Sequence, residues 1–402
     1  MRSPRHLSAA LRHGTVCVLA ALALLAGVPA SGASAPARPA APAAPGPDRE
    51  AAALPVAQRW SAVLRGGFVR AANTAVTCRG AVTPGVPSCA AAARPVSAGG
   101  PGRGAAAPVS NGDYSLLYAD VDRDPHTYNS SRARLRVPEG ARIRYARLYW
   151  GGNLRVGERK PPKDNARVLF AEPGGAYRAL RADTVTGHRV AGGADAFQSS
   201  ADVTRLVRAA GPGLYTVAQI NVARGNSPTG GWGGWTLVAA YERKSEPLRR
   251  LSLWDGFRTL RADERDRRSL SVGLPALRVP AGARGSAGIV AYDGDRGLDG
   301  DSVTVRTGNA PAVPLGDAAN PTADVFNSTV SEGGAERAGD RVPGPPNTFG
   351  YDSDVLDLGR ALRSGGTGLR VRFTALRDSL WLGALFLQTD AGSRTAGGGS
   401  GG

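Results

Sequence analysis

Three short acidic stretches carry the residues best suited to chemistry in this 402-residue chain. They are DVDRD (120–124), DGDRGLDGD (293–301) and YDSD (351–354). Alternating carboxylates in a loop can converge on one Ca²⁺, which takes about six to eight oxygen ligands. The predicted calcium ligands, from the first two stretches and the asparagine after the first, are Asp120, Asp122, Asp124, Asn129, Asp293, Asp295, Asp299 and Asp301. The alternative is that these residues only end strands and fix turns.

Two tryptophans in GGWGGW (230–235) suggest a second kind of site. An indole face can stack on a sugar ring, and neighbouring glycines leave such a ring accessible. Trp235 begins a strand with a counterpart at Trp381, so we predict that it lies in the core. Trp232 has no such counterpart and is the candidate ligand-binding residue with an exposed ring.

Sequence motifs for catalysis are scarce. No histidine stands near a serine in a nucleophile elbow, and the HExxH, P-loop and dinucleotide-binding patterns are absent. Glycoside hydrolysis needs two carboxylates but no motif, so a pair such as Asp293 with Glu242 leaves a hydrolase open. We expect a non-catalytic protein.

The N-terminal region has the pattern of a secretory signal peptide. Arg2, Arg5 and Arg12 precede an apolar run at 16–28 and a small-residue stretch. We predict a signal peptide at 1–33, with cleavage after Ala33 and with Ala30 and Ala35 as alternatives. The apolar run is shorter than the roughly 20 residues of a membrane span, so we expect no transmembrane segment after signal removal.

Composition predicts two further segments that form no core. Residues 34–56 are Ala/Pro-rich and are expected to be a disordered linker, and 391–402 a flexible Gly-rich tail. Cys78 and Cys89 stand close together in a chain that is expected to be exported. We therefore predict a disulfide between them and a protein that is either released or associated with the cell wall after secretion.

The formal net charge of +17 comes almost entirely from arginine. The arginines are scattered among apolar and acidic residues, and no nucleic-acid-binding motif accompanies them, so nucleic acid is not an expected partner. A basic secreted protein is attracted to anionic wall polymers by electrostatics. A cell-wall glycopolymer or a surface protein is therefore the expected partner.

Apolar residues mostly alternate with polar ones, which predicts half-buried strands. In LRVRF (369–373) the odd-numbered residues face one way. In LYTVAQINV (214–222) the same rule places Leu214, Thr216 and Ala218 on the apolar face. Short helices are expected only before Arg65 and in DVTRLVRAA (202–210).

The word LRVP-x-GAR occurs twice, at 135–142 and 277–284. Similar stretches follow both copies in the same order: DVTRLV and DVLDLG, GLYTVAQI and GLRVRF, GWTLVAAYE and LWLGALFLQ. This repetition predicts an all-β fold of two tandem related, jelly-roll-like β-sandwich domains, at 57–270 and 271–390. The repeated word is expected to form a turn after a strand.

Several of these stretches together resemble an uncharacterised family of exported actinobacterial β-rich proteins. The resemblance covers about Phe68 to Asp390. It is carried by NTAVTC (73–78), YADVDRDPHTYNSS (118–131), ARLYWGGN (146–153), LWDGF (253–257) and GYDSDVLDLG (350–359). Members of that family often stand beside adhesin-like repeat modules. The resemblance implies a surface role and no particular reaction.

We therefore predict a secreted, non-catalytic, adhesin-like binding protein of the cell surface, in which calcium stabilises loops. The alternatives are an extracellular polysaccharide hydrolase on a jelly-roll scaffold and a structural component of the wall or spore coat. A hydrolase requires two carboxylates facing each other in a groove, about 5–10 Å apart.

Overall fold

A computed structural model describes residues 54–94 and 108–392 of the chain. The predicted signal peptide (1–33), most of the predicted linker (34–56) and almost all of the predicted tail (391–402) lie outside these residues. Leu54 to Val56, at the end of the predicted linker, lie in a strand. Among the described residues, no helix has the length and apolarity needed to cross a membrane.

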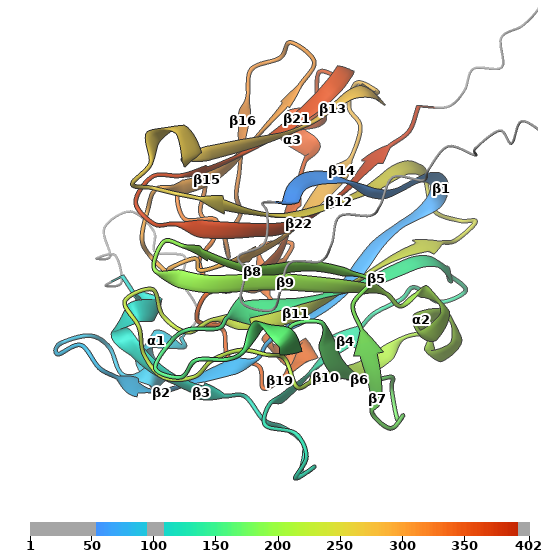
Figure 1. The fold of residues 1–402 in the computed structure, drawn as a ribbon. Coiled ribbons are helices and arrows are strands. Elements are labelled where there is room, and N and C mark those ends of the chain that lie inside the picture. The colour runs from blue at the N-terminus through green and yellow to red at the C-terminus, as the bar shows by residue number, and fades with distance from the viewer. Residues whose placement is uncertain (1–53, 95–107, 393–402) are drawn as a thin grey trace, which may run out of the picture. The chain divides into compact units, whose positions relative to one another are not determined.

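The described residues are almost entirely β-structure, arranged as two sandwiches that also pack on each other (Figure 1). The inner sheet of the first sandwich contains β1 (Leu54–Thr74), β11 (Gly233–Glu242), β5 (Arg142–Asn153), β9 (Ala194–Asp202) and β8 (Thr184–Ala191). Its outer sheet contains β19 (Arg341–Val342), β4 (Ser130–Leu135), β10 (Gly213–Ala218), β6 (Arg167–Ala171) and β7 (Arg178–Arg181).

The second sandwich has the same two-sheet construction. Its inner sheet contains β18 (Ala335–Glu336), β17 (Val330–Glu332), β20 (Tyr351–Asp357), β14 (Gly285–Tyr292), β22 (Leu380–Asp390) and β12 (Leu248–Leu260). Its outer sheet contains β13 (Ser269–Val279), β21 (Gly366–Ala375), β15 (Asp301–Thr307) and β16 (Val313–Leu315).

The remaining elements are short. A two-stranded sheet consists of β2 (Val76–Ala81) and β3 (Tyr114–Tyr118). The helices are α1 (Cys89–Ala92), α2 (Thr204–Ala210) and α3 (Gly359–Leu362). The 3-10 turns are η1 (Asn111–Asp113), η2 (Pro162–Asp164), η3 (Arg265–Arg267) and η4 (Ala338–Asp340).

The duplication predicted from the repeated words is present in the strand pairing. In the first sandwich β4 pairs with β10, β11 with β5, and β5 with β9. In the second, β13 pairs with β21, β22 with β14, and β14 with β20. The helix predicted in DVTRLVRAA is α2, and α3 occupies the equivalent place between β20 and β21. The fold is therefore two tandem, related β-sandwiches.

The word LRVP-x-GAR forms the same turn in both copies. The amide of Ala141 donates to the carbonyl of Pro138 (3.1 Å), and the amide of Ala283 donates to that of Pro280 (3.2 Å). The glycine between them has a φ of +72° at Gly140, and the second copy has nearly the same value. Only glycine adopts this backbone region without strain. The repeated motif is therefore explained by the turn that both copies form.

Strand β1 joins the two inner sheets into one continuous sheet of 11 strands. Its first part, up to Arg65, pairs with β12, and its second part, from Gly66, pairs with β11. A Cβ at Gly66 would lie 1.9 Å from the carbonyl oxygen of Tyr241, so no larger residue fits at this crossing. The helix expected before Arg65 is therefore wrong, because this segment is held between strand partners that are distant in sequence.

Three large apolar clusters fill the structure: one inside each sandwich, and a third, rich in aromatic rings, between the two inner sheets. The predicted alternation in LRVRF is confirmed, because Leu369, Val371 and Phe373 are buried. In β10 the prediction has the wrong phase, since Tyr215 and Val217 face the core. Gln219, with a φ of +62°, interrupts the pleat, so the core side shifts by one residue beyond it.

One strand of the second copy also joins a sheet of the first sandwich. The short strand β19, from the second half of the sequence, pairs with β4 in the outer sheet of the first sandwich. The described residues, from Leu54 onward, group into one compact unit by their contacts. These contacts cross the predicted sequence boundary at residue 270.

Candidate anion-binding site

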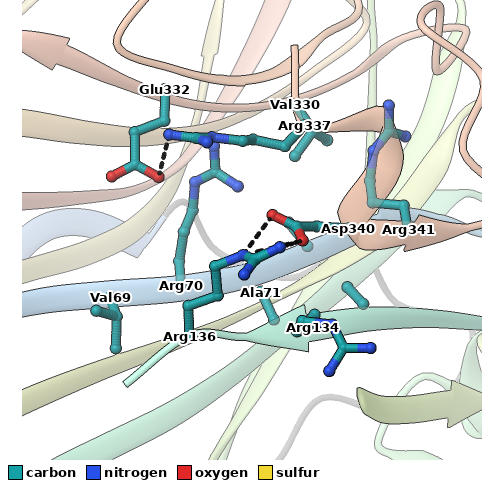
Figure 2. A pocket seen from close by; sticks show the side chains of 12 residues that line it. Val69, Arg70, Ala71, Arg134, Arg136, Val330, Glu332, Arg337, Asp340 and Arg341 are labelled. Carbon is teal, nitrogen blue, oxygen red and sulfur yellow. Dashed lines mark hydrogen bonds and ion pairs between the residues drawn. The ribbon is translucent and has the colours of Figure 1, made fainter. Parts of the chain in front are cut away.

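A pocket of about 190 Å³ lies where β1 and β4 meet the segment that runs from β17 to β19 (Figure 2). We call it the arginine-lined pocket, because five arginines contribute to its wall: Arg70, Arg134, Arg136, Arg337 and Arg341. Its lining also includes Glu332 and Asp340. The wall therefore has an excess of three positive charges.

Strand pairing brings these arginines together from distant parts of the sequence. Arg70 is in β1, and Arg341 in β19 pairs in register with Ala133 of β4. Arg337 follows the hairpin of β17 and β18 and is the residue before η4. The pocket forms because β19, from the second half of the sequence, pairs with β4 in the outer sheet of the first sandwich.

Arg341 is the most deeply buried of the five, with 4% of its surface exposed. Its Nη1 donates to Oδ1 of Asn73 (3.3 Å), and its Nη2 donates to the carbonyl of Pro345 (2.7 Å). Arg70 donates through Nη2 to the carbonyl of Ser331. These bonds hold two guanidinium groups in place through neutral acceptors.

Three of the arginines that line the pocket, Arg70, Arg337 and Arg341, have a buried Nε without an acceptor among the described residues. An unsatisfied buried donor costs about 1–3 kcal/mol, and more when the group is charged. A ligand that accepts hydrogen bonds in this pocket would remove that cost.

The charges in the pocket are only partly balanced. Arg136 is paired with Asp340, with Nε 3.0 Å from each carboxylate oxygen, and Arg337 lies 3.5 Å from Glu332 (Figure 2). Carboxylates also act on the two buried arginines, Glu332 and Asp354 on Arg70, and Glu336 and Asp354 on Arg341. The arginines of the lining nevertheless outnumber its carboxylates, which favours a small anion there.

Burial dominates the local electrostatics. It lowers the pKa of Arg341 to about 10, against the opposing charge of Glu336, and the positive charge of Arg70 adds to the lowering. Burial also lowers the pKa of Arg70, against the opposing charge of Glu332, and the charge of Arg337 adds to that lowering. A bound anion would stabilise both charges.

Guanidinium groups bind carboxylates and phosphates through paired, planar hydrogen bonds. The arginine-lined pocket therefore has the chemistry of a site for one small anionic group. The sequence alone gave no signal for it, because Arg70, Arg337 and Arg341 belong to no motif and look like other scattered arginines.

The first predicted calcium cluster is closed by its own hydrogen bonds. Asp120 accepts from the hydroxyl of Ser130 (2.7 Å), and Asp122 accepts from the amide of Asp124 (2.9 Å). Asn129 donates to the carbonyl of Ile220 (2.7 Å). These are loop-fixing contacts, as in the alternative interpretation of the sequence.

The second predicted cluster is divided in the structure. Asp293 and Asp295 line one pocket, Asp299 is exposed, and Asp301 accepts the amides of residues 325 and 326. Asp293 shares its pocket with Asp378, which the sequence did not single out, and Glu242 is not part of it. Across the described residues, no group of three or more His, Cys, Asp or Glu is arranged to hold a metal ion.

The expectation that the Trp232 ring is exposed is wrong. Trp232 has 0% exposure and packs between the two inner sheets, with its ring centroid 5.8 Å from that of Tyr292 and 6.5 Å from that of Trp381. Trp235 is buried as predicted. The glycines around Trp232 allow close packing of the backbone: a Cβ at Gly233 would meet the carbonyl oxygen of Gly151 at 2.8 Å.

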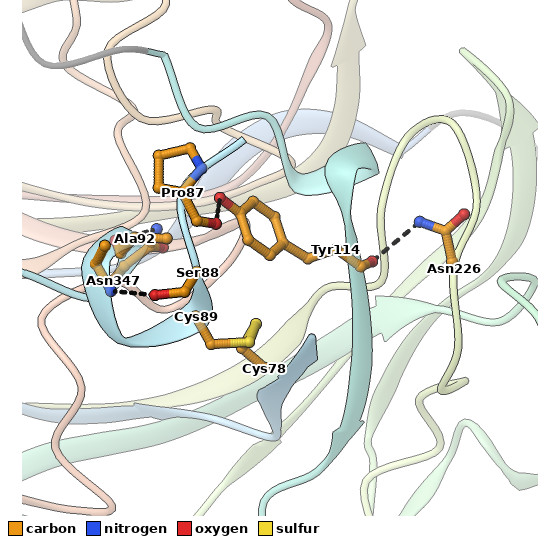
Figure 3. Close-up of a disulfide and its surroundings, with 9 residues drawn as sticks. Cys78, Pro87, Ser88, Cys89, Ala92, Tyr114, Asn226 and Asn347 are labelled. Carbon is orange, nitrogen blue, oxygen red and sulfur yellow. Dashed lines mark hydrogen bonds between the residues drawn. A yellow bond between two sulfur atoms is a disulfide. The ribbon is translucent and has the colours of Figure 1, made fainter. Parts of the chain in front are cut away.

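The predicted disulfide between Cys78 and Cys89 is confirmed, with the two Cα atoms 5.7 Å apart (Figure 3). It joins β2 to α1. The hydroxyl of Tyr114 donates to the carbonyl of Pro87 (2.9 Å), and Asn347 donates to that of Ala92 (3.1 Å). The disulfide thus anchors a loop that also contacts the second copy.

One histidine contacts a carboxylate: Nδ1 of His188 lies 3.0 Å from Asp195. A pocket beside them is otherwise lined by Arg159, Lys160 and two prolines. No serine, threonine or cysteine lines this pocket, so the pair has no nucleophile to activate there.

The fold is that of a protein with two related β-sandwiches. Comparisons with known proteins do not assign it to a more specific class of protein. No family model matches the chain, and no curated protein matches it. Among solved structures, the major capsid protein P2 of bacteriophage PM2 is 13% identical, over 68% of this chain and 97% of that one, with a TM-score of 0.19.

A structure of Sulfolobus turreted icosahedral virus is 10% identical over 64% of this chain and 86% of that chain, with a TM-score of 0.23. PNGase F, a glycosylasparaginase from Flavobacterium meningosepticum, is 12% identical over 68% and 94%, with a TM-score of 0.17. Similarities as low as these do not indicate the function of this protein.

Proposed function

We propose that this protein is a secreted, non-catalytic binding protein of the cell surface, and that the arginine-lined pocket holds one anionic group of an envelope glycopolymer. The group is a phosphate or a carboxylate, because both accept paired hydrogen bonds from guanidinium groups. The carrying observation is the set of buried Nε donors without acceptors on Arg70, Arg337 and Arg341.

Two other features support this proposal. The disulfide between Cys78 and Cys89 is a feature of oxidising environments such as the extracellular space. The net charge of +17 favours approach to anionic polymers over long range, while the pocket supplies a defined point of attachment.

The test is a binding assay with the purified mature chain on three immobilised polymers: polyglycerol phosphate, polygalacturonate and neutral dextran. We expect retention on one or both anionic polymers and none on dextran. Rising salt should weaken the binding, because Arg134 and Arg136 at the pocket are exposed.

Two variants distinguish binding in the arginine-lined pocket from attraction by the net positive charge of the protein. Arg337→Gln removes a partly exposed arginine of the pocket, so the fold should tolerate it, and we expect at least a tenfold loss of affinity. Arg370→Gln removes the same charge from an exposed position on β21 and should change affinity less than twofold. Equal losses in both variants would reduce the interaction to non-specific charge attraction.

The same assay distinguishes the alternatives. Release of reducing sugar from polygalacturonate or dextran would support the polysaccharide hydrolase. Failure to bind any of the three polymers would contradict the proposal and favour a structural role.

A further inference from the structure

A second charged pocket lies at the ends of strands of the second sandwich, with a volume of about 400 Å³. We call it the acidic pocket, because Asp293, Asp295 and Asp378 line it together, with the exposed Asp263, which is paired with Arg261, at its edge. The first two follow β14, and Asp378 lies in the turn between β21 and β22. Backbone pairing of β14 with β22 brings these turns together.

The carboxylates of this pocket are shielded from solvent to different degrees. Asp293 has 5% exposure, whereas Asp295 and Asp378 are partly exposed, and Asp295 accepts the amide of Asn111 (2.7 Å). The indole N–H of Trp232 lies near the carboxylate of Asp293 and favours its charged form. In Asp378, Oδ1 accepts the amide of Ser379 (2.7 Å), whereas Oδ2 is buried without a partner.

The three carboxylates also repel one another. Burial raises the pKa of Asp293 well above its usual range, and the charges of Asp378 and Asp295 add to the shift. Burial raises the pKa of Asp295 to about 6. Among the described residues of the lining, the one cation is Arg377, whose side chain is exposed.

We propose that the acidic pocket is a second binding site, separate from the arginine-lined pocket, and that it takes the protonated primary amine of an amino sugar. An ammonium group has three donors and one positive charge, which match the buried carboxylate of Asp293 and the unpartnered Oδ2 of Asp378. The hydroxyl groups of Thr229 and Ser379 line the same pocket and offer partners for sugar hydroxyls.

An ammonium group fits this pocket better than a metal ion does. Calcium requires about six to eight converging oxygens, and the described carboxylates form no such group. An amine needs only a few acceptors, and its binding favours the ionised form of the carboxylates around it.

The experiment is calorimetric titration of the mature chain with glucosamine at pH 7, with N-acetylglucosamine as the matched neutral sugar. We expect glucosamine to bind and the acetylated sugar to bind at least tenfold more weakly, because acetylation removes the charge. Equal binding of the two sugars, or no binding of either, would overturn the proposal.

Asp378→Asn tests the pocket itself. It removes one of three repelling charges and should raise the melting temperature while weakening glucosamine binding at least tenfold. Glu139→Gln, which removes an exposed negative charge from the turn between β4 and β5, should leave both unchanged. Unaltered glucosamine binding in Asp378→Asn would contradict the assignment.

A calcium titration of the same protein completes the test. We expect no heat of binding and no change in melting temperature on addition of Ca²⁺ or of a chelator. Stabilisation by Ca²⁺ that Asp378→Asn abolishes would instead make the acidic pocket a metal site.

Discussion

The two sandwiches share one pairing scheme but differ at the ends of equivalent strands. Trp150 of β5 pairs with Trp235 of β11, and Tyr292 of β14 pairs with Trp381 of β22. The residue after Trp150 is Gly151, whereas the residue after Tyr292 is Asp293. At this position β5 continues with a neutral residue, whereas β14 has ended and a buried carboxylate follows it.

The comparison extends to the other two residues of the acidic pocket. Asn153 stands where the second copy has Asp295, and Trp232 stands three residues before its paired tryptophan, as Asp378 does. The amide of Asn153 is satisfied, since it donates to the carbonyl of Gly230 (3.0 Å). The two copies thus share the ladders that build the cores, whereas their strand ends carry neutral residues in the first copy and carboxylates in the second.

The largest expected effect comes from removing the paired tryptophans, which tests whether they have the same role in the two sandwiches. Trp235→Ala and Trp381→Ala each empty a fully buried position, and we expect each to cost about 3–5 kcal/mol of unfolding free energy. Trp235→Ala should cost more by about 1 kcal/mol, because its indole N–H donates to the hydroxyl of Ser131 (2.9 Å). Denaturant titration of both variants measures the difference; a loss below 1 kcal/mol in either would contradict the shared core role.

The disulfide belongs to the first copy alone. In the chain-entropy account, opening a loop with a sequence separation of 11 costs about 3 kcal/mol. We expect the double variant Cys78→Ser, Cys89→Ser to lose about that amount of unfolding free energy. Thermal unfolding with and without reductant checks it, since reductant should lower the melting temperature of the parent protein and leave the variant unchanged.

Matched aspartates give a pH test of the two copies. Asp202 of β9 and Asp354 of β20 occupy equivalent ladder positions, opposite Arg147 and Ile289. Asp202 is exposed, whereas Asp354 is 2% exposed beneath β17. Burial raises the pKa of Asp354 to about 7, from an unfolded value of 3.8.

A carboxyl group whose pKa is raised on folding holds its proton more tightly in the folded state. Its contribution to stability is therefore full below about pH 4 and is lost as the pH rises through about 7. We expect the unfolding free energy to fall between pH 5 and pH 8, and Asp354→Asn to reduce that fall by at least about 1.4 kcal/mol. Asp202→Asn should leave the slope unchanged; identical slopes in the two variants would contradict the assignment.

The smallest expected effect concerns the repeated turn. Gly140→Ala and Gly282→Ala place a side chain at φ values of +72° and +70°, with no atom within 4 Å of the added Cβ. Each should therefore cost about 1–2 kcal/mol through backbone strain alone. Equal losses would confirm that the two turns are interchangeable, and a loss in only one copy would show that they are not.

Local patterns predicted much of the fold. Alternating apolar residues, the repeated turn word and the pair of cysteines each act over a few residues, so the strands of LRVRF, the duplication and the disulfide could be inferred. The phase of β10 could not, because it depends on the backbone of Gln219. The helix expected before Arg65 failed for a related reason: that segment is a strand because β12 pairs with it.

The candidate sites were less accessible to sequence reasoning. The acidic stretch at 293–301 drew attention to Asp293 and Asp295, but not to Asp378, which reaches them through the pairing of β14 with β22. Trp232 was placed on the surface because glycines surround it, whereas the packing of the two inner sheets buries it.

The sequence by itself determined which segments become strands, where the chain turns and that one unit is written twice, because side-chain periodicity and glycine conformation are local properties. Only the tertiary structure decided which charges meet. Arg70, Arg337 and Arg341 come together because β19 joins the outer sheet of the other copy, and the three aspartates do so because two strand ends lie side by side. Burial then removes water as a hydrogen-bond partner of these charged groups. Their lack of partners therefore depends on the folded structure and not on the residue types.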